Sequence, residues 1–237
     1  MTVWQSMLII TVAVAVPVEA FVTLRRDRVA LRQDRLEDRG AFFIWTLLVL
    51  WSSAALGVGL SVLSGASLGH IGLGPGRSDG QALVAWAMSI SLSLLALGQW
   101  IGVRQSSRLR RRFRARYQDI GDLQAYLPST PSEQALFNWV GLSAGLTEEV
   151  IFRGVLIWAL ALTMPLWLAA GLSLLLFVAL HRYQGTSGMF RVGVLGLLLT
   201  VIVLMSGSLW PAMLLHASVD IFNGLVLWRL RPATGVE

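Results

Sequence analysis

Six ionisable side chains that could carry out hydrolysis lie in apolar segments of the C-terminal half of the chain. They are Glu148, Glu149, Arg153, His181, His216 and Asp220. A charged side chain at the centre of a bilayer costs at least ~2.5–3.5 kcal/mol, so such residues face a protein interior or a wet cavity and have partners. Carboxylates and histidines that converge on a water molecule can act as general bases or bind a metal ion. The sequence therefore predicts one buried polar site.

The spacing of these residues divides them between supporting and reactive positions. Glu149 and Arg153 are four residues apart, so they share a helix face and can form an ion pair. Glu148 is turned about 100° away from Glu149 and is free to meet another partner. His216 and Asp220 are also four residues apart, so Asp220 can accept a hydrogen bond from His216 and fix its tautomer.

Two kinds of chemistry fit this set of residues. Glu148, His181 and His216 could hold Zn²⁺ with an open fourth position. Alternatively, Glu148 could act as the general base with help from a histidine and without a metal. Taken singly, the Glu149–Arg153 pair could be a structural ion pair and the His216–Asp220 pair a hydrogen bond between packed helices. Only their occurrence together favours catalysis.

The composition predicts an all-α, polytopic membrane protein as the scaffold for this site. The chain is 55% hydrophobic and only 14% charged, whereas a soluble domain carries about a quarter charged residues. Stretches long and apolar enough to cross a bilayer of ~30 Å indicate about seven helices. They cover residues 2–24, 41–63, 81–103, 138–163, 165–182, 190–206 and 208–228.

The basic residues indicate the topology. All 19 are arginine, and 13 of them lie in the linkers 25–39 and 104–116. Because cytoplasmic loops are enriched in basic residues, we expect the N-terminus outside and the C-terminus in the cytoplasm. Arginines beside the spans can contact the anionic headgroups of membrane lipids, which accounts for the net charge of +6. Nucleic-acid binding is therefore not expected. Cysteine is absent, which excludes disulfides and thiolate metal sites.

Two geometrical requirements follow from the predicted spans. Thr130, Pro131 and Glu133 form a capping box, so a helix should begin near residue 131. If it continued to Thr163 it would be about 50 Å long, and we expect a strong tilt or a bend near Gly141 or Gly145. Glu148 and His181 fall roughly 25 Å from the outer surface, but His216 falls only about 8 Å past Pro211. The turn 207–211 must therefore dip into the membrane.

Three motifs together resemble those of a known family. Glu148-Glu149-x-x-x-Arg153, Phe177-x-x-x-His181 and His216-x-x-x-Asp220 resemble the signature of the CPBP family of CAAX-protease and bacteriocin-processing (Abi) intramembrane proteases. The resemblance implies a catalytic four-helix region in residues 131–237, preceded in residues 1–130 by three transmembrane helices with arginine-rich linkers. Asp220 stands where the prenyl-protein branch has asparagine, which favours the prokaryotic branch and a prokaryotic plasma membrane.

The resemblance also implies an activity. The protein would be an endopeptidase that cleaves a membrane-associated or lipidated protein or peptide near its C-terminus or near the membrane. Glu148 would activate water with help from His181. His216 and the residue at position 220 would stabilise the oxyanion. Arg153 would hold the two glutamates in place. A mechanism without a cofactor is favoured, with Zn²⁺ as the alternative. The alternative functions are a non-catalytic scaffold or bacteriocin-immunity type protein, and a proton-coupled transporter, against which the absence of a visible inverted repeat counts.

Overall fold

The computed structural model describes residues 39–116 and 126–231, and all of its regular elements are helical. The first predicted span, 2–24, lies outside these residues. The elements are α3 (Arg39–Leu63), α4 (Gly80–Gln105), α5 (Ser107–Arg116), α6 (Pro131–Glu148), the π-helix η3 (Glu149–Leu156), α7 (Ile157–Ala161), α8 (Leu166–Leu180), the 3₁₀-helix η4 (His181–Gln184), α9 (Gly185–Ser206) and α10 (Trp210–Leu230).

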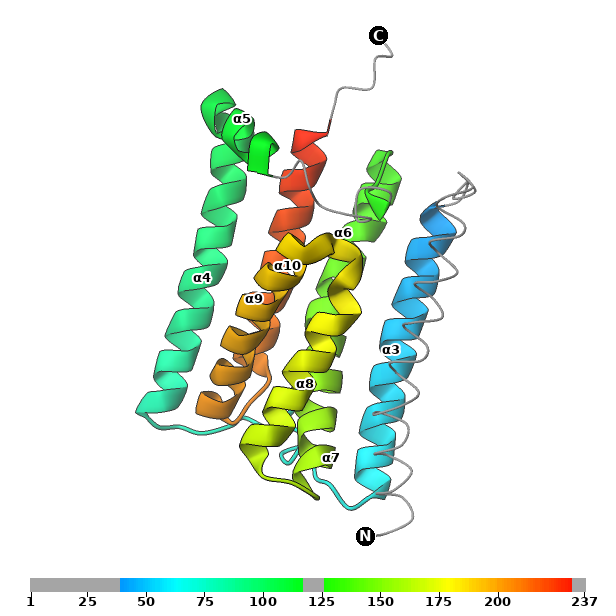
Figure 1. Cartoon of the computed structure of the whole chain (residues 1–237), viewed down its shortest axis with the longest axis vertical. Helices are drawn as coiled ribbons and strands as arrows, with labels where there is room; N and C mark the ends of the chain where they lie inside the picture. Colours follow the sequence, from blue (N-terminus) through cyan, green and yellow to red (C-terminus); the bar gives the residue numbers. More distant parts are fainter. Residues whose placement is uncertain (1–38, 117–125, 232–237) are drawn as a thin grey trace.

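The long helices lie side by side as a bundle that is consistent with a multi-pass membrane protein (Figure 1). Four stretches of the described residues are long and apolar enough to cross a bilayer. They are Arg39–Leu63, Gly80–Gln105, Leu166–Ser206 and Trp210–Leu230. The third contains α8, η4 and α9, which fold back as a hairpin, so its two helices run in opposite directions (Figure 1). The all-helical membrane fold is confirmed at this level, while the count of seven spans and the orientation stay predictions.

The helix predicted to begin near residue 131 begins at Pro131, after the N-cap Thr130. The Thr130 hydroxyl accepts a hydrogen bond from the Glu133 backbone N–H at 3.2 Å, and the Glu133 carboxylate accepts one from the backbone N–H of Ser129 at 2.7 Å. The first bond satisfies an amide group that the first turn of a helix leaves without a partner, and the second ties the Glu133 carboxylate to the residue before the N-cap. The capping box therefore fixes where α6 starts.

Neither of the two expected glycines interrupts α6, which continues through both of them to Glu148. Their role is close packing. A Cβ atom at Gly145 would collide with the backbone of Ala217, and one at Gly141 would press on Asp220. The absence of these side chains allows α6 to lie against α10. This contact brings the end of α6 beside the middle of α10.

The irregular part of the long helix is η3, which begins one residue after Glu148. All eight of its residues are buried. The Ser173 hydroxyl of α8 donates a hydrogen bond to the Phe152 carbonyl oxygen at 2.7 Å, and the Phe152 ring packs edge-on against Phe177 at 5.2 Å between centroids. The π-helix is thus held by α8, and such insertions are frequent at functional sites.

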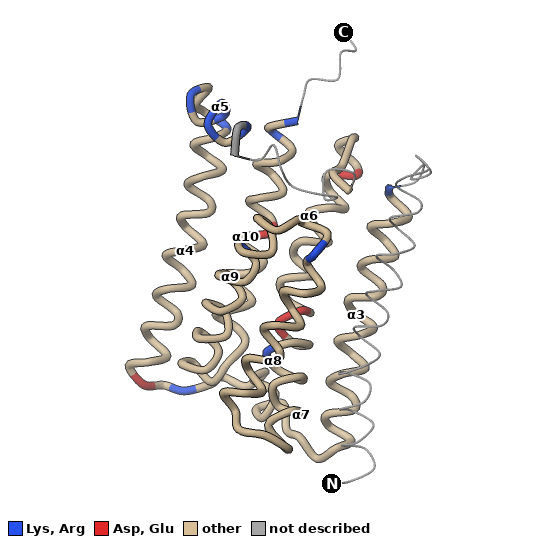
Figure 2. The backbone as a smooth tube through the Cα atoms, viewed as in Figure 1, with Lys and Arg blue, Asp and Glu red and all other residues tan. Residues whose placement is uncertain are grey.

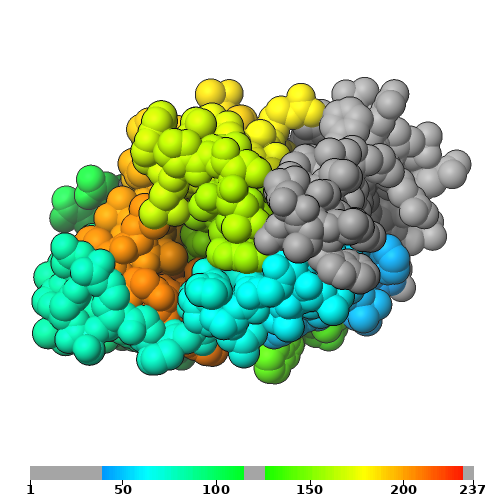
Figure 3. Space-filling model, turned by 90° about the horizontal axis from the view of Figure 1, so that it is seen from below, coloured from blue at the N-terminus to red at the C-terminus, as the bar shows by residue number. Residues whose placement is uncertain are grey.

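The turn between α9 and α10 lies above the lower ends of α3 and α7 and about level with the lower end of α4 (Figure 1). Its depth in the membrane stays a prediction. The loop between α3 and α4 holds the turn there through backbone bonds from Leu209 N–H to the Gly72 oxygen (2.8 Å) and from Arg77 N–H to the Ser206 oxygen (2.7 Å). Gly76 has φ +78°, and a Cβ there would collide with Ser206. Seen from this end, the cyan atoms of the loop lie beside the orange atoms of the turn (Figure 3).

Candidate functional site

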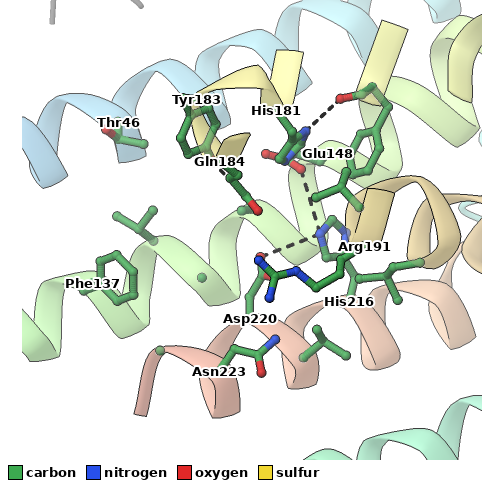
Figure 4. Close-up of a pocket in the computed structure, with 18 of the residues that line it drawn as sticks. Thr46, Phe137, Glu148, His181, Tyr183, Gln184, Arg191, His216, Asp220 and Asn223 are labelled. Atoms are coloured by element: carbon green, nitrogen blue, oxygen red, sulfur yellow. Dashed lines mark hydrogen bonds and ion pairs between the residues drawn. The ribbon is translucent and has the colours of Figure 1, made fainter. Parts of the chain in front are cut away.

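The predicted site residues come together where α6, η3, α8 and α10 meet. Four of them, Glu148, His181, His216 and Asp220, line a cavity of about 420 Å³ (Figure 4). Glu149 and Arg153 do not line the cavity and are buried. Most of the other lining is apolar: Leu50, Phe137, Val140, Gly141, Ala144, Phe177, Val192, Leu195, Val219, Gly224 and Leu227. A mainly apolar cavity with a few polar groups is the usual form of a binding site.

Glu149 joins Arg153 and His216 in one buried cluster. Its Oε1 accepts hydrogen bonds from Arg153 Nη1 at 2.9 Å and from His216 Nδ1 at 2.8 Å. Arg153 also donates to the carbonyl oxygen of Gly196 at 3.2 Å and lies over the Phe177 ring at 4.2 Å. Charged groups in a low-dielectric interior require such partners. The predicted Glu149–Arg153 pair is therefore present and extends to a third residue.

The partner that orients His216 is Glu149, not Asp220 as the spacing suggested. Because a carboxylate accepts hydrogen bonds, His216 carries a proton on Nδ1, and its Nε2 is the nitrogen left for the cavity. The Asp220 carboxylate lies 3.6 Å from Nε2, beyond the usual length of a hydrogen bond. The i,i+4 spacing brought Asp220 close, but the sequence could not show that α6 presents a carboxylate to the other nitrogen.

Glu148 differs from its neighbour because its carboxylate faces the cavity. Its Oε2 atom lies 3.9 Å from Nε2 of His216 and, like Oε2 of Glu149, is a buried oxygen without a hydrogen-bond partner in the part of the chain that the structure describes. The side chain is 18% exposed, whereas that of Glu149 is 0% exposed. Glu148 is thus the glutamate with capacity to bind a water molecule or a substrate.

His181 ends α8 and enters the cavity from the opposite wall (Figure 4). Its Nδ1 lies 2.7 Å from the carbonyl oxygen of Phe177. A carbonyl oxygen only accepts, so Nδ1 donates and Nε2 is the nitrogen available to a ligand. The ring also packs against Phe177 and Tyr183, with centroids 4.5 and 5.9 Å away. The orientation of His181 is therefore fixed by α8 and η4.

Sequence reasoning missed several polar residues of the cavity, namely Thr46, Tyr183, Gln184, Arg191 and Asn223. Arg191 lines the cavity because the α8–α9 hairpin turns below the upper ends of α4 and α10 (Figure 1). No signal of this depth is present in the sequence, because the predicted span 165–182 would be about 27 Å long, close to the ~30 Å core of a bilayer.

No group of three His, Asp or Glu side chains within residues 39–116 and 126–231 is arranged as ligands of a metal ion. His216 Nδ1 and His181 Nδ1 are both engaged in hydrogen bonds, which leaves one nitrogen of each ring facing the cavity. The choice between a mechanism without a cofactor and Zn²⁺ held by Glu148, His181 and His216 stays a prediction, and the steps proposed below use the side chains alone.

A comparison with family models gives a match over residues 131–222 to the type II CAAX prenyl endopeptidase Rce1-like family. The search of curated proteins and the search of solved structures found no match. The matched region begins at the first residue of α6 and contains all six candidate site residues. The match of residues 131–222 to this family's model agrees with the family that the three sequence motifs resemble, while the prokaryotic branch stays a prediction.

Proposed function

We propose that this protein is an intramembrane endopeptidase that hydrolyses a peptide bond of a membrane-associated or lipidated substrate. One observation carries the proposal: the partly exposed Glu148 carboxylate lines a cavity that it shares with two imidazoles oriented through their Nδ1 atoms. Such a carboxylate can bind a water molecule and take its proton as the water attacks a carbonyl carbon. The family of residues 131–222 supports the same type of reaction.

The proposed proton movements use the nitrogens that face the cavity. Glu148 accepts the proton of the attacking water, while His181 Nε2 accepts the second hydrogen bond of that water and orients it. His216 donates from Nε2 to the tetrahedral oxyanion when its ring carries both protons, with Glu149 and Asp220 as the counter-charges. Glu148 then passes its proton to the departing amine, which restores the carboxylate.

This scheme gives Asp220 a role that does not require it to contact the oxyanion. An ionised aspartate would repel a developing negative charge, but at 3.6 Å from His216 Nε2 it favours the imidazolium that stabilises that charge. An asparagine at this position would instead donate a hydrogen bond to the oxyanion directly. Asp220 is therefore proposed to act through His216.

The cavity wall supports an apolar or lipidated substrate. Its lining extends from Glu148 along α6 to Phe137, along α10 to Leu227 and along α3 to Thr46, in each case toward the end of the bundle that carries the arginines of α5 (Figure 2). A substrate chain entering from that end would pass Leu50, Phe137 and Val140 before it reached Glu148. By the topology predicted from the arginines, this is the cytoplasmic side.

The proposal is tested with Glu148→Gln and His181→Ala in native membranes. Each variant should lose at least about 100-fold of the cleavage rate, as expected when a general base is removed, while the amount of inserted protein stays unchanged. Glu148→Gln should also trap the substrate for identification by crosslinking and mass spectrometry. Glu133→Gln, which changes a carboxylate at the exposed start of the same helix, is the matched control and should keep full activity.

Two outcomes would replace the proposal. Full biological rescue of a deletion strain by Glu148→Gln would show a scaffold or immunity-type protein instead of an enzyme. Stoichiometric zinc in the purified protein, together with inhibition by a strong chelator, would replace the water activation by side chains with a zinc mechanism through Glu148, His181 and His216.

A further inference from the structure

A second cavity, also of about 420 Å³, lies between the arginine-rich ends of α4 and α10. It is lined by Trp100, Arg104, Leu225, Trp228 and Arg229, and none of these lines the cavity that holds Glu148. Two guanidinium groups thus share a hollow with two indole rings and a leucine. Neither the catalytic scheme nor the family match uses these residues, since the matched region ends at residue 222.

The charges around this hollow are of one sign. Helices α4 and α5 contain no Asp or Glu, and the single carboxylate of α10, Asp220, lies in the catalytic cavity. Helix α5 adds exposed arginines at the same end of the bundle (Figure 2). In the described helices, Arg104 and Arg229 therefore face a site without acidic partners, which suits an anionic ligand.

Packing fixes the walls of the hollow. Phe113 of α5 packs on Val103, Val226 and Leu230, which form a small apolar cluster between α4 and α10. The Arg110 side chain donates a hydrogen bond to the Arg104 carbonyl oxygen at 2.9 Å, at the end of α4. Arg104 lies over the Trp100 ring at 5.6 Å. The backbone of Arg104 is thus held by α5, and its guanidinium group lies over a ring of its own helix α4.

We propose that this cavity binds the headgroup of an anionic phospholipid from the leaflet at the arginine-rich end. Guanidinium groups bind phosphate through paired, charge-assisted hydrogen bonds, which Arg104 and Arg229 would supply. Tryptophan rings prefer the level of the headgroups, where Trp100 and Trp228 would cover the glycerol and the first carbons of an acyl chain. The apolar half of the lining favours a lipid over free phosphate.

The experiment compares binding of phosphatidylglycerol and phosphatidylcholine to the detergent-purified full-length protein. Retained lipid is counted by native mass spectrometry, and the thermal unfolding midpoint is measured with each lipid. The wild type should retain phosphatidylglycerol selectively and be stabilised by it. In the double variant Arg104→Gln/Arg229→Gln the affinity for phosphatidylglycerol should fall by about tenfold.

The matched control is Arg111→Gln/Arg112→Gln, which removes the same charge from exposed positions of α5 outside the cavity. It should keep the selectivity for phosphatidylglycerol. An equal loss of affinity in both double variants would show diffuse attraction by the arginine cluster and would overturn the proposed lipid site. An unchanged affinity in Arg104→Gln/Arg229→Gln would also overturn it. Stabilisation by inorganic phosphate equal to that by phosphatidylglycerol would overturn the assignment to a lipid.

Discussion

At the scale of single residues, the two adjacent glutamates have separate environments. Glu149 is fully buried with Arg153 and His216 as partners, while Glu148 is partly exposed and lines the cavity. The sequence predicted this division because consecutive helical residues point about 100° apart and only Glu149 is spaced to meet Arg153. It could not predict which nitrogen of His216 would be bonded, because that depends on how α6 and α10 approach each other.

Glu149 and Glu148 should therefore differ in their effect on stability. Arg153→Met removes the arginine partner of Glu149 and leaves a buried carboxylate with His216 alone, so the free energy of unfolding should fall by about 3–5 kcal/mol. Glu148→Gln breaks no hydrogen bond of Glu148 Oε2, so it should change the free energy of unfolding by less than about 1 kcal/mol. Denaturant unfolding in the same detergent measures both. Equal stability of Arg153→Met and the wild type would contradict the supporting role of the Glu149–Arg153 pair.

At the scale of elements, the start of α6 was predictable and its middle was not. The capping residues are local, so the sequence alone placed the first turn at Pro131. The π-helix and the role of Gly145 depend on contacts with α8 and α10, which no local pattern reveals. Of the two expected alternatives, a strong tilt or a bend at the glycines, the structure shows no break of α6 at either glycine, because a glycine in a helix serves a close approach as readily as a kink.

The contact between α6 and α10 gives a prediction at this scale. In Gly145→Ala the new methyl group meets the backbone of Ala217, so the two helices must separate. The free energy of unfolding should fall by about 1–3 kcal/mol. Activity should fall strongly, because His216 moves away from Glu148. Gly171→Ala in α8 is the matched control, because a Cβ there has no neighbour within 4 Å. It should be neutral or stabilise the protein by about 0.4–1 kcal/mol. A harmless Gly145→Ala would refute the role assigned to this contact.

At the scale of the whole molecule, the arginines of α5 mark one end of the bundle and the loop between α3 and α4 lies at the other (Figures 1 and 2). Composition was sufficient to predict this arrangement, since hydropathy and basic residues alone define spans and sides. Composition could not predict that the α8–α9 hairpin turns within the depth of the bundle. The whole stretch Leu166–Ser206 is apolar, so its hydropathy does not show how deep the turn between the two helices lies. The hairpin is what brings His181 and Arg191 to the cavity.

The absence of native cysteine allows the predicted orientation to be tested with single cysteines. Ser67 in the loop between α3 and α4 and Arg111 in α5 are both exposed and lie at opposite ends of the bundle. In intact cells a membrane-impermeant maleimide should label Ser67→Cys, whereas Arg111→Cys should be labelled only after the membrane is permeabilised. The reverse pattern would invert the topology and place the entrance of the cavity outside the cell.

The hydrogen bonds beneath the α9–α10 turn have a consequence for modularity. The region that matches the family begins at Pro131, but the backbone partners that hold the turn before His216 come from Gly72 and Arg77, in the loop between α3 and α4. The family region is therefore not a portable unit in this chain. A fragment that starts at α6 would carry every proposed catalytic residue and lack the contacts that set the depth of one of them. The loop between α3 and α4 should accordingly tolerate little change, although none of its side chains takes part in the proposed chemistry.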